Sequence, residues 1–242
     1  MSITVRIFES LGAMAFDMII TATPKISERF PPLKTITIQN FPILDEILQP
    51  KVIPYRERSF SVCYVGGISK VRGAIEMVSA FQLLSDFDGI RFDLAGTFNS
   101  EELALSSKLL SGWKYVHYYG QACRSTVGNI LGQARVGLVL LHPIPNYLES
   151  QPIKMFEYMA SGIPVIASDF PFWRQFIEQA KCGIMVDPLD PESIASAIRW
   201  IFDHPREAEQ MGKYGQEAVK KYFNWDAEAP KLLDLYGGLL AS

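Results

Sequence analysis

The sequence contains few cysteines and histidines, and this shortage excludes several kinds of site. Its three cysteines, Cys63, Cys123 and Cys182, lie far apart, no Cys-x-x-Cys pair occurs, and none of the three histidines pairs at metal-ligand spacing. We therefore expect no metal site and no disulfide framework, but reduced, semi-buried thiols in a cytoplasmic protein. The Gly-x-Ser-x-Gly turn that presents a serine nucleophile is also missing.

Long apolar runs and an excess of positive charge are missing as well. No run approaches the roughly 18 apolar residues that a membrane-spanning helix needs, so we expect at most peripheral contact with the inner face of the cell membrane. Lys and Arg number 23 against 26 Asp and Glu, which leaves no general positive field to attract nucleic acid. With 48% hydrophobic and 20% charged residues, the 242-residue chain has the composition of a globular protein.

Short β-branched and aromatic runs alternate with segments of helical period. This alternation is typical of an α/β protein with a Rossmann-like, doubly wound parallel sheet. The predicted strands are 60–65, 90–95, 114–119, 136–141, 164–167 and 183–186. The predicted helices are 72–84, 100–110, 124–134, 151–160, 172–180, a helix that begins after Asp190, 206–222 and 226–240.

The first 54 residues have a different pattern. They predict helices at 5–14 and from Pro24, strands at 18–21 and 35–38, and a proline-rich linker at 40–54. Two strands are too few for an independent sheet with its own core. We therefore divide the chain into a remnant of a preceding domain with its linker (1–54), a Rossmann-like domain (55–223) and a terminal helix (224–242).

The stretch from Gly66 to Gly73, GGISKVRG, follows an apolar strand and begins a helix. Glycines allow close backbone approach, and free N–H groups at a helix start favour an anion, to which Lys70 or Arg72 would add full charge. The stretch matches neither the dinucleotide fingerprint nor the P-loop. It is equally compatible with an ordinary tight turn that carries solvated cations.

Two carboxylates, Glu149 and Glu157, lie eight positions apart across a predicted helix start. Eight residues of helix rise about 12 Å, comparable to the distance between the ribose and the sugar of an extended nucleotide diphosphate sugar. The amides of Ser150 and Gln151 would then face a diphosphate at the positive end of the helix. From spacing alone, the favoured alternative is a solvated loop charge at Glu149 and a surface residue at Glu157.

Four segments in order carry a family resemblance. YVGGISKVRGAIEMVSAF, ESQPIKMFEYMASGIPVIASDFPFW, CGIMVDPLDPESIASAI and FNWDAEAPKLLDLYGGL resemble the C-terminal half of family 4 (group 1) glycosyltransferases, which have the two-domain GT-B fold. The resemblance covers about residues 55–242. It implies retaining transfer of a sugar from a nucleotide diphosphate donor, without a metal or other cofactor, in polysaccharide or lipid-linked glycan synthesis.

The resemblance also implies roles for single residues. Glu149 would face the transferred sugar and Glu157 the ribose, and Arg72, with Glu149, would be catalytic. Gly67 stands where many relatives have Arg, and SQPIK replaces a glycine-rich stretch, so that the second phosphate contact would be either lost or supplied by Lys70 or Lys154. The donor site is predicted to contain Gly66, Gly67, Lys70, Arg72, Gly120, Ser150, Gln151, Lys154 and Glu157, with the nucleotide base at 119–121.

Relatives place an acceptor-binding domain before this half, and residues 1–45 resemble only its end. We therefore expect that the chain by itself binds donor weakly and transfers sugar poorly, that a separate chain could carry the acceptor domain, and that the terminal helix has an exposed or paired apolar face (Leu232, Leu233, Leu235, Leu239). A sugar-nucleotide binding subunit and a GT-B nucleotide-sugar epimerase are the alternative functions.

Overall fold

The computed structural model describes residues 3–47 and 53–241, and a six-stranded parallel sheet forms its centre. The order across the sheet is β5-β4-β3-β6-β7-β8, so the first strand, β3, lies in the middle beside β6. The chain adds strands on one side of β3 and then on the other. The strands are β3 (Ser61–Val65), β4 (Arg91–Ala95), β5 (Val116–Gly120), β6 (Val136–Val139), β7 (Val165–Ser168) and β8 (Gly183–Val186).

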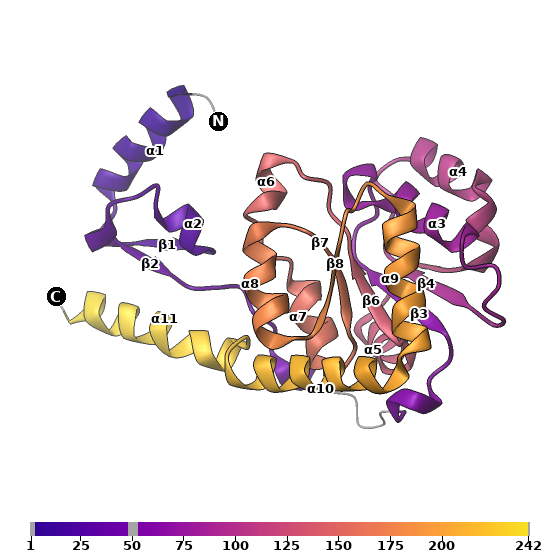
Figure 1. The fold of residues 1–242 in the computed structure, drawn as a ribbon. Coiled ribbons are helices and arrows are strands. Elements are labelled where there is room, and N and C mark those ends of the chain that lie inside the picture. The colour runs from indigo at the N-terminus through magenta and orange to yellow at the C-terminus, as the bar shows by residue number, and fades with distance from the viewer. Residues whose placement is uncertain (1–2, 48–52, 242) are drawn as a thin grey trace.

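Helices cover both faces of this sheet, as a parallel sheet of apolar strands requires. α7 and α8 lie on one side, and α3 and α9 pack together on the other (Figure 1). The helix predicted to begin after Asp190 is confirmed as α9, and the Asp190 carboxylate caps it by accepting hydrogen bonds from the backbone N–H groups of Glu192 and Ser193. The helices of this part are α3 (Ala74–Gln82), α4 (Glu101–Leu109), α5 (Arg124–Gln133), α6 (Pro145–Leu148), α7 (Ile153–Ala160), α8 (Pro171–Ala180), α9 (Pro191–Asp203) and α10 (Pro205–Lys221).

A glycine in β6 fixes the position of α7 on the sheet. A Cβ at Gly137 would lie 2.3 Å from the ring of Tyr158, so the absence of a side chain makes room for this aromatic ring. The buried Tyr158 hydroxyl accepts a hydrogen bond of 2.9 Å from the Val65 N–H at the end of β3. α7 is thereby held against β3 and β6, the two central strands.

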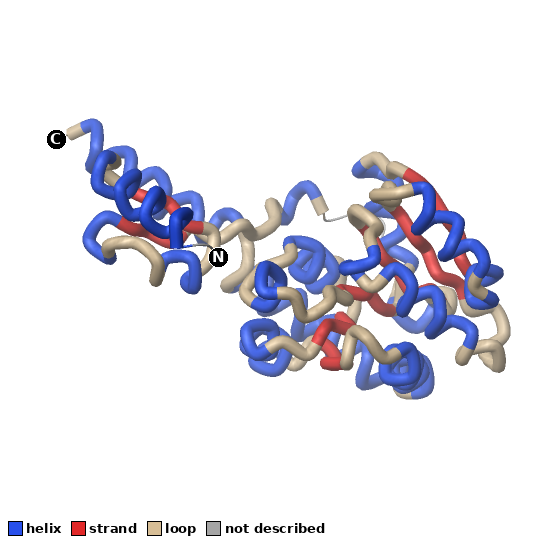
Figure 2. The backbone as a smooth tube through the Cα atoms, turned by 90° about the horizontal axis from the view of Figure 1, so that it is seen from above, coloured by secondary structure: helices blue, strands red, loops and turns tan. Residues whose placement is uncertain are grey.

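The N-terminal segment lies apart from this sheet (Figure 2). It contains α1 (Ile3–Ala15), α2 (Pro24–Ser27) and the parallel pair β1 (Ile19–Thr21) and β2 (Thr35–Thr37). The terminal helix α11 (Trp225–Leu240) runs back toward it, and Glu228, buried on α11, accepts a hydrogen bond from the Gln39 N–H at 3.0 Å. α11 therefore connects the two parts of the molecule.

The apolar face predicted for the terminal helix is partly exposed. Leu233 and Leu239 of α11 are exposed, as expected, whereas Leu232 and Leu235 are half-buried. Within residues 3–47 and 53–241, none of the helices combines the length and the apolarity needed to cross a membrane. The three-part division of the chain remains a prediction.

Several predicted boundaries are wrong. β5 begins at Val116 and not at Lys114, because 111–115 form a 3-10 turn, and α7 begins at Ile153. The short helix α6 was not predicted, and part of the predicted linker, 48–52, lies outside the described residues. The cysteines are free thiols, but the prediction that they are semi-buried is wrong, because Cys63 and Cys182 are fully buried and Cys123 is exposed. Hydrogen bonds from Ser125 and Thr126 lower the pKa of Cys123 to about 6.

Candidate functional site

The strand order creates a crevice at the carboxyl ends of β3 and β6. Connections leave these two neighbouring strands toward opposite sides of the sheet, which is where open α/β sheets bind their ligands. The predicted glycine stretch leaves β3 at this point, and the predicted carboxylates follow β6. The topology therefore brings the two candidate motifs to one edge of the sheet.

Glycines let the loops after β3, β4 and β5 lie against each other. Gly96 has a φ of +143°, and a Cβ there would lie 1.9 Å from the carbonyl oxygen of Gly66. The Gly96 N–H donates to the carbonyl oxygen of Gly120 at 2.7 Å, and Gly120 itself has a φ of +64°. An L side chain at position 96 would push these loops apart.

A hollow of about 300 Å³ lies between these loops. Backbone and small side chains form most of its wall, which suits a flat ring. It contains the predicted Gly66 and Gly67, and Gln121 from the loop predicted to hold the base, but Gly120 does not line it. The lining residues are Val65, Gly66, Gly67, Ala95, Gly96, Thr97, Gln121, Ala122 and Val127.

Arg72 folds back over the glycine turn. Its Nη1 donates to the carbonyl oxygen of Gly67 at 3.2 Å, and a Cβ at Gly67 would lie 2.9 Å from that nitrogen. Burial lowers the pKa of Arg72, but hydrogen bonds and charge interactions with Tyr147 and Tyr64 outweigh it and raise the pKa above its ordinary value. The absence of a side chain at Gly67 allows this position of the guanidinium.

Lys154 approaches the same turn from α7. Its Nζ lies 3.7 Å from the ring centroid of Tyr64 and 3.0 Å from where a Cβ of Gly66 would be. Burial, together with the charge of Arg72, lowers the pKa of Lys154 to about 7. The structure thus brings Lys154 and Arg72 together at the end of β3.

Lys70 lies elsewhere. Its exposed side chain lines a different hollow, of about 440 Å³, with residues of α3 and of the region around α4, among them Glu76, Ser100 and Glu102. Lys70 therefore does not line the hollow at the glycine turn, although it is only two positions from Arg72 in the sequence.

Glu157 is half-buried near the start of α7. Because α7 begins at Ile153, Glu157 lies just past the first turn and not nearly two turns into the helix, as its sequence position predicted. Its side chain is 20% exposed, so the alternative of a surface residue is wrong. Burial raises its pKa, and Arg124 and Lys154 oppose this rise. Arg124 Nη1 lies 3.6 Å from Glu157 Oε1, and its Nη2 lies 2.8 Å from Glu46 Oε2.

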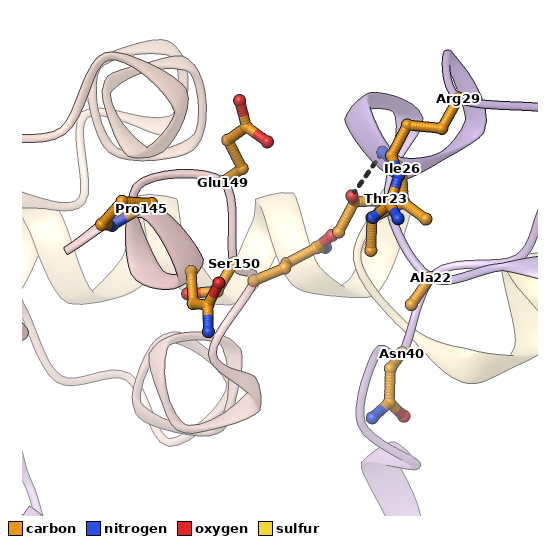
Figure 3. A pocket seen from close by; sticks show the side chains of 10 residues that line it. Ala22, Thr23, Ile26, Arg29, Asn40, Pro145, Glu149 and Ser150 are labelled. Carbon is orange, nitrogen blue, oxygen red and sulfur yellow. Dashed lines mark hydrogen bonds between the residues drawn. The ribbon is translucent and has the colours of Figure 1, made fainter. Parts of the chain in front are cut away.

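Glu149 ends the short helix α6 and faces a second cleft. This cleft, of about 420 Å³, separates the α6–α7 connection from the N-terminal segment, and Figure 3 shows Glu149 and Ser150 on one side with Thr23 and Asn40 on the other. Glu149 is exposed, which agrees with the alternative that it is a solvated charge in a loop. The cleft is lined by Ala22, Thr23, Ile26, Arg29, Asn40, Pro145, Asn146, Glu149, Ser150 and Gln151.

The connection between Glu149 and α7 is held from three sides. The Ser150 N–H donates to Tyr147 O at 3.1 Å, so α6 already uses an amide that we expected to face a diphosphate. The Trp173 indole donates to Ser150 O at 2.7 Å. Gln151 Oε1 accepts a hydrogen bond of 2.9 Å from Gln39 Nε2, and this contact ties the cleft to the N-terminal segment.

Sequence reasoning missed three residues of this site. Tyr64 lies in a strand whose pattern is apolar throughout, and Gln39 lies between a predicted strand and the predicted linker, so neither gave a signal. Arg124 follows the predicted base loop at a helix start, where a basic residue opposes the helix dipole. This unfavourable position was the feature of the sequence that could have identified Arg124 as a site residue.

Comparison with known proteins identifies the family of the chain. Residues 45–218 match the family model described as Glycosyl transferases group 1. A D-rhamnosyltransferase, WbpZ, of Pseudomonas aeruginosa is 27% identical over 53% of this chain and 33% of its own length. A phosphatidyl-myo-inositol mannosyltransferase of Mycobacterium leprae is 24% identical over 77% of this chain and 49% of its own length. The chain thus spans half or less of these curated relatives.

The solved structures give the fold. The structure of Anabaena HepE in complex with UDP-glucose superposes with a TM-score of 0.79 at 15% identity, over 98% of this chain and 68% of that one. Such a likeness establishes a shared α/β fold with the GT-B glycosyltransferases. Since the family model covers more than half of the sequence, this chain belongs to the group 1 glycosyl transferases.

Proposed function

We propose that this chain is the donor-binding half of a retaining family 4 glycosyltransferase, which transfers a sugar from a nucleotide diphosphate sugar to a glycan or lipid-linked acceptor. The observation that carries the proposal is the gathering of Arg72, Lys154 and Glu157 around the glycine turn where β3 and β6 diverge. UDP-glucose bound by HepE, a structural neighbour, supports a nucleotide sugar as the ligand.

Each group has a chemical task in this proposal. The hollow beside Gln121 receives the base, and Glu157 accepts hydrogen bonds from the ribose hydroxyls. Arg72 stabilises the diphosphate as it leaves with increasing negative charge. Glu149, which is exposed in the cleft toward the N-terminal segment, faces the transferred sugar.

Transfer without a metal, a cytoplasmic location with peripheral membrane contact, and an acceptor domain on a separate chain remain predictions. A sugar-nucleotide binding subunit and an epimerase would use the same donor site. Product analysis separates the three functions: a transferase releases nucleoside diphosphate, an epimerase changes the sugar, and a binding subunit returns the donor unchanged.

Glu157→Gln is expected to weaken the binding of one nucleoside diphosphate about tenfold. The substitution keeps the size of the side chain but replaces charged hydrogen bonds to ribose with neutral ones, which costs about 1.4 kcal/mol. Calorimetric titration of the purified chain with UDP and with GDP measures the change and identifies the base.

Glu178→Gln is the matched control, because Glu178 is a helical glutamate that pairs with an arginine, Arg174, but lies on the surface of α8. This variant should bind like the wild type. A folded wild-type chain that binds neither nucleotide would contradict the proposal.

A further inference from the structure

The amine of Lys154 is buried without a counterion in direct contact. Its Nζ is closed off from solvent, and among the residues that the structure describes it has no hydrogen-bond partner. Its Nζ instead makes a cation–π contact with Tyr64, whose ring centroid lies 3.7 Å away. A buried ammonium that makes no hydrogen bonds is costly, so the fold keeps an unfavourable group at this point.

A second cation lies beside it. The charge of Arg72 acts on Lys154 and lowers its pKa, which means that the two groups repel each other. Glu157 opposes this effect but is itself shared with Arg124. Two cations held close together are stabilised when a ligand with two or more negative charges comes between them.

The glycine turn borders both the hollow and the two cations. Gly66 and Gly67 border the hollow at the end of β3, and Lys154 Nζ lies directly against Gly66. Gly67 offers no charged side chain of its own. Lys154, which arrives from α7, is therefore the group that complements Arg72 at this turn.

We propose that Lys154 is the second cation of the donor-diphosphate site, acting with Arg72 across the Gly66–Gly67 turn. This inference rests on the proposed function. It gives a binding role to a side chain that the packing of the apo protein does not explain. Lys154 is a binding residue here, and no bond is made or broken at its nitrogen.

Lys154→Met should weaken nucleoside diphosphate binding about tenfold at pH 7, the equivalent of one charge-assisted hydrogen bond. The probes are UDP and GDP, each compared with its nucleoside, uridine or guanosine. Nucleoside affinity should not change, because the base and ribose sites are intact. Lys108→Met, on the exposed surface of α4, is the matched control and should bind both probes like the wild type.

The thermal midpoint should move in the opposite direction. Methionine fills the same space without the cost of a buried charge, so Lys154→Met should raise Tm by roughly 2 to 4 °C, whereas Lys108→Met should leave it unchanged. A lysine with a structural role would lose stability on replacement, and that result would overturn the inference.

The pH dependence gives an independent readout. Arg72, Glu157, Cys63 and Tyr64 face Lys154, whose pKa is about 7 in the free protein. Below pH 7 the amine is charged before the nucleotide arrives, whereas above pH 7 binding must first take up a proton. The advantage of wild type over Lys154→Met in nucleoside diphosphate affinity should therefore shrink as pH rises through 7.

The outcomes separate the two proposals. If the wild type binds neither diphosphate nor nucleoside, the proposed function fails and this inference fails with it. If the wild type binds diphosphate more tightly than nucleoside and Lys154→Met shows the same ratio of the two affinities, the donor site stands and the role of Lys154 is wrong.

Discussion

Gly96→Ala is expected to lower the free energy of unfolding by about 3 kcal/mol and to abolish measurable nucleotide binding. The φ of +143° at Gly96 is strained for an L residue, and the new Cβ would lie 1.9 Å from Gly66 O, a backbone atom that must move. That movement opens the turn around which Arg72 and Lys154 gather. Urea unfolding and calorimetry with UDP and GDP measure the two effects.

Gly89→Ala separates backbone strain from the clash. Gly89 also has a positive φ, +73°, but a Cβ there would meet nothing within 4 Å. We expect it to cost about 1 kcal/mol and to leave nucleotide binding unchanged. If the two variants lost equal stability, or if Gly96→Ala bound nucleotide like the wild type, the close packing of the β3 and β4 loops would not be what shapes the site.

Local sequence patterns were sufficient to predict much of this fold. The apolar runs of β3, β6 and β7 and the Asp190-Pro191 start of α9 depend on residues near one another in the chain. The resemblance to the family then assigned the glycine turn and the carboxylates to one donor site. These predictions needed no knowledge of long-range packing.

The details of the site depend on long-range contacts and were not predictable in the same way. Lys154 reaches Gly66 because Tyr158 holds α7 against β3. The ring of Tyr158 fits there because Gly137 has no side chain. The hydrogen bond from the Ser150 amide follows from α6, whose four residues carry no helical period. The resemblance to the family identified Glu149 and Glu157 as site residues. It did not predict that Glu157 is half-buried and that Glu149 is exposed.

The contacts with the N-terminal segment are a further long-range feature. Gln39 donates its backbone N–H to Glu228 of α11 and its side chain to Gln151 beside Glu149. One residue of the connecting stretch thus joins the terminal helix to the cleft that Glu149 faces. This arrangement places the exposed Glu149 between the two parts of the chain.

Arg72→Met is expected to weaken nucleoside diphosphate binding about a hundredfold, roughly 2.7 kcal/mol, without changing nucleoside binding. The variant loses the charge-assisted hydrogen bonds from the Arg72 guanidinium to phosphate. This planar group can make more such hydrogen bonds than a lysine ammonium can. Calorimetry with UDP and GDP against their nucleosides measures the loss. Arg206→Met, an exposed residue in the first turn of α10, is the matched control and should bind like the wild type.

The double variant Arg72→Met/Lys154→Met tests whether the two cations share one anion. Loss of Arg72 alone relieves the repulsion that lowers the pKa of Lys154, so the remaining ammonium is charged more readily and compensates in part. With both cations removed, this compensation disappears. The combined loss of binding free energy should therefore exceed the sum of the two single losses, and additive losses would mean that Arg72 and Lys154 act at separate places.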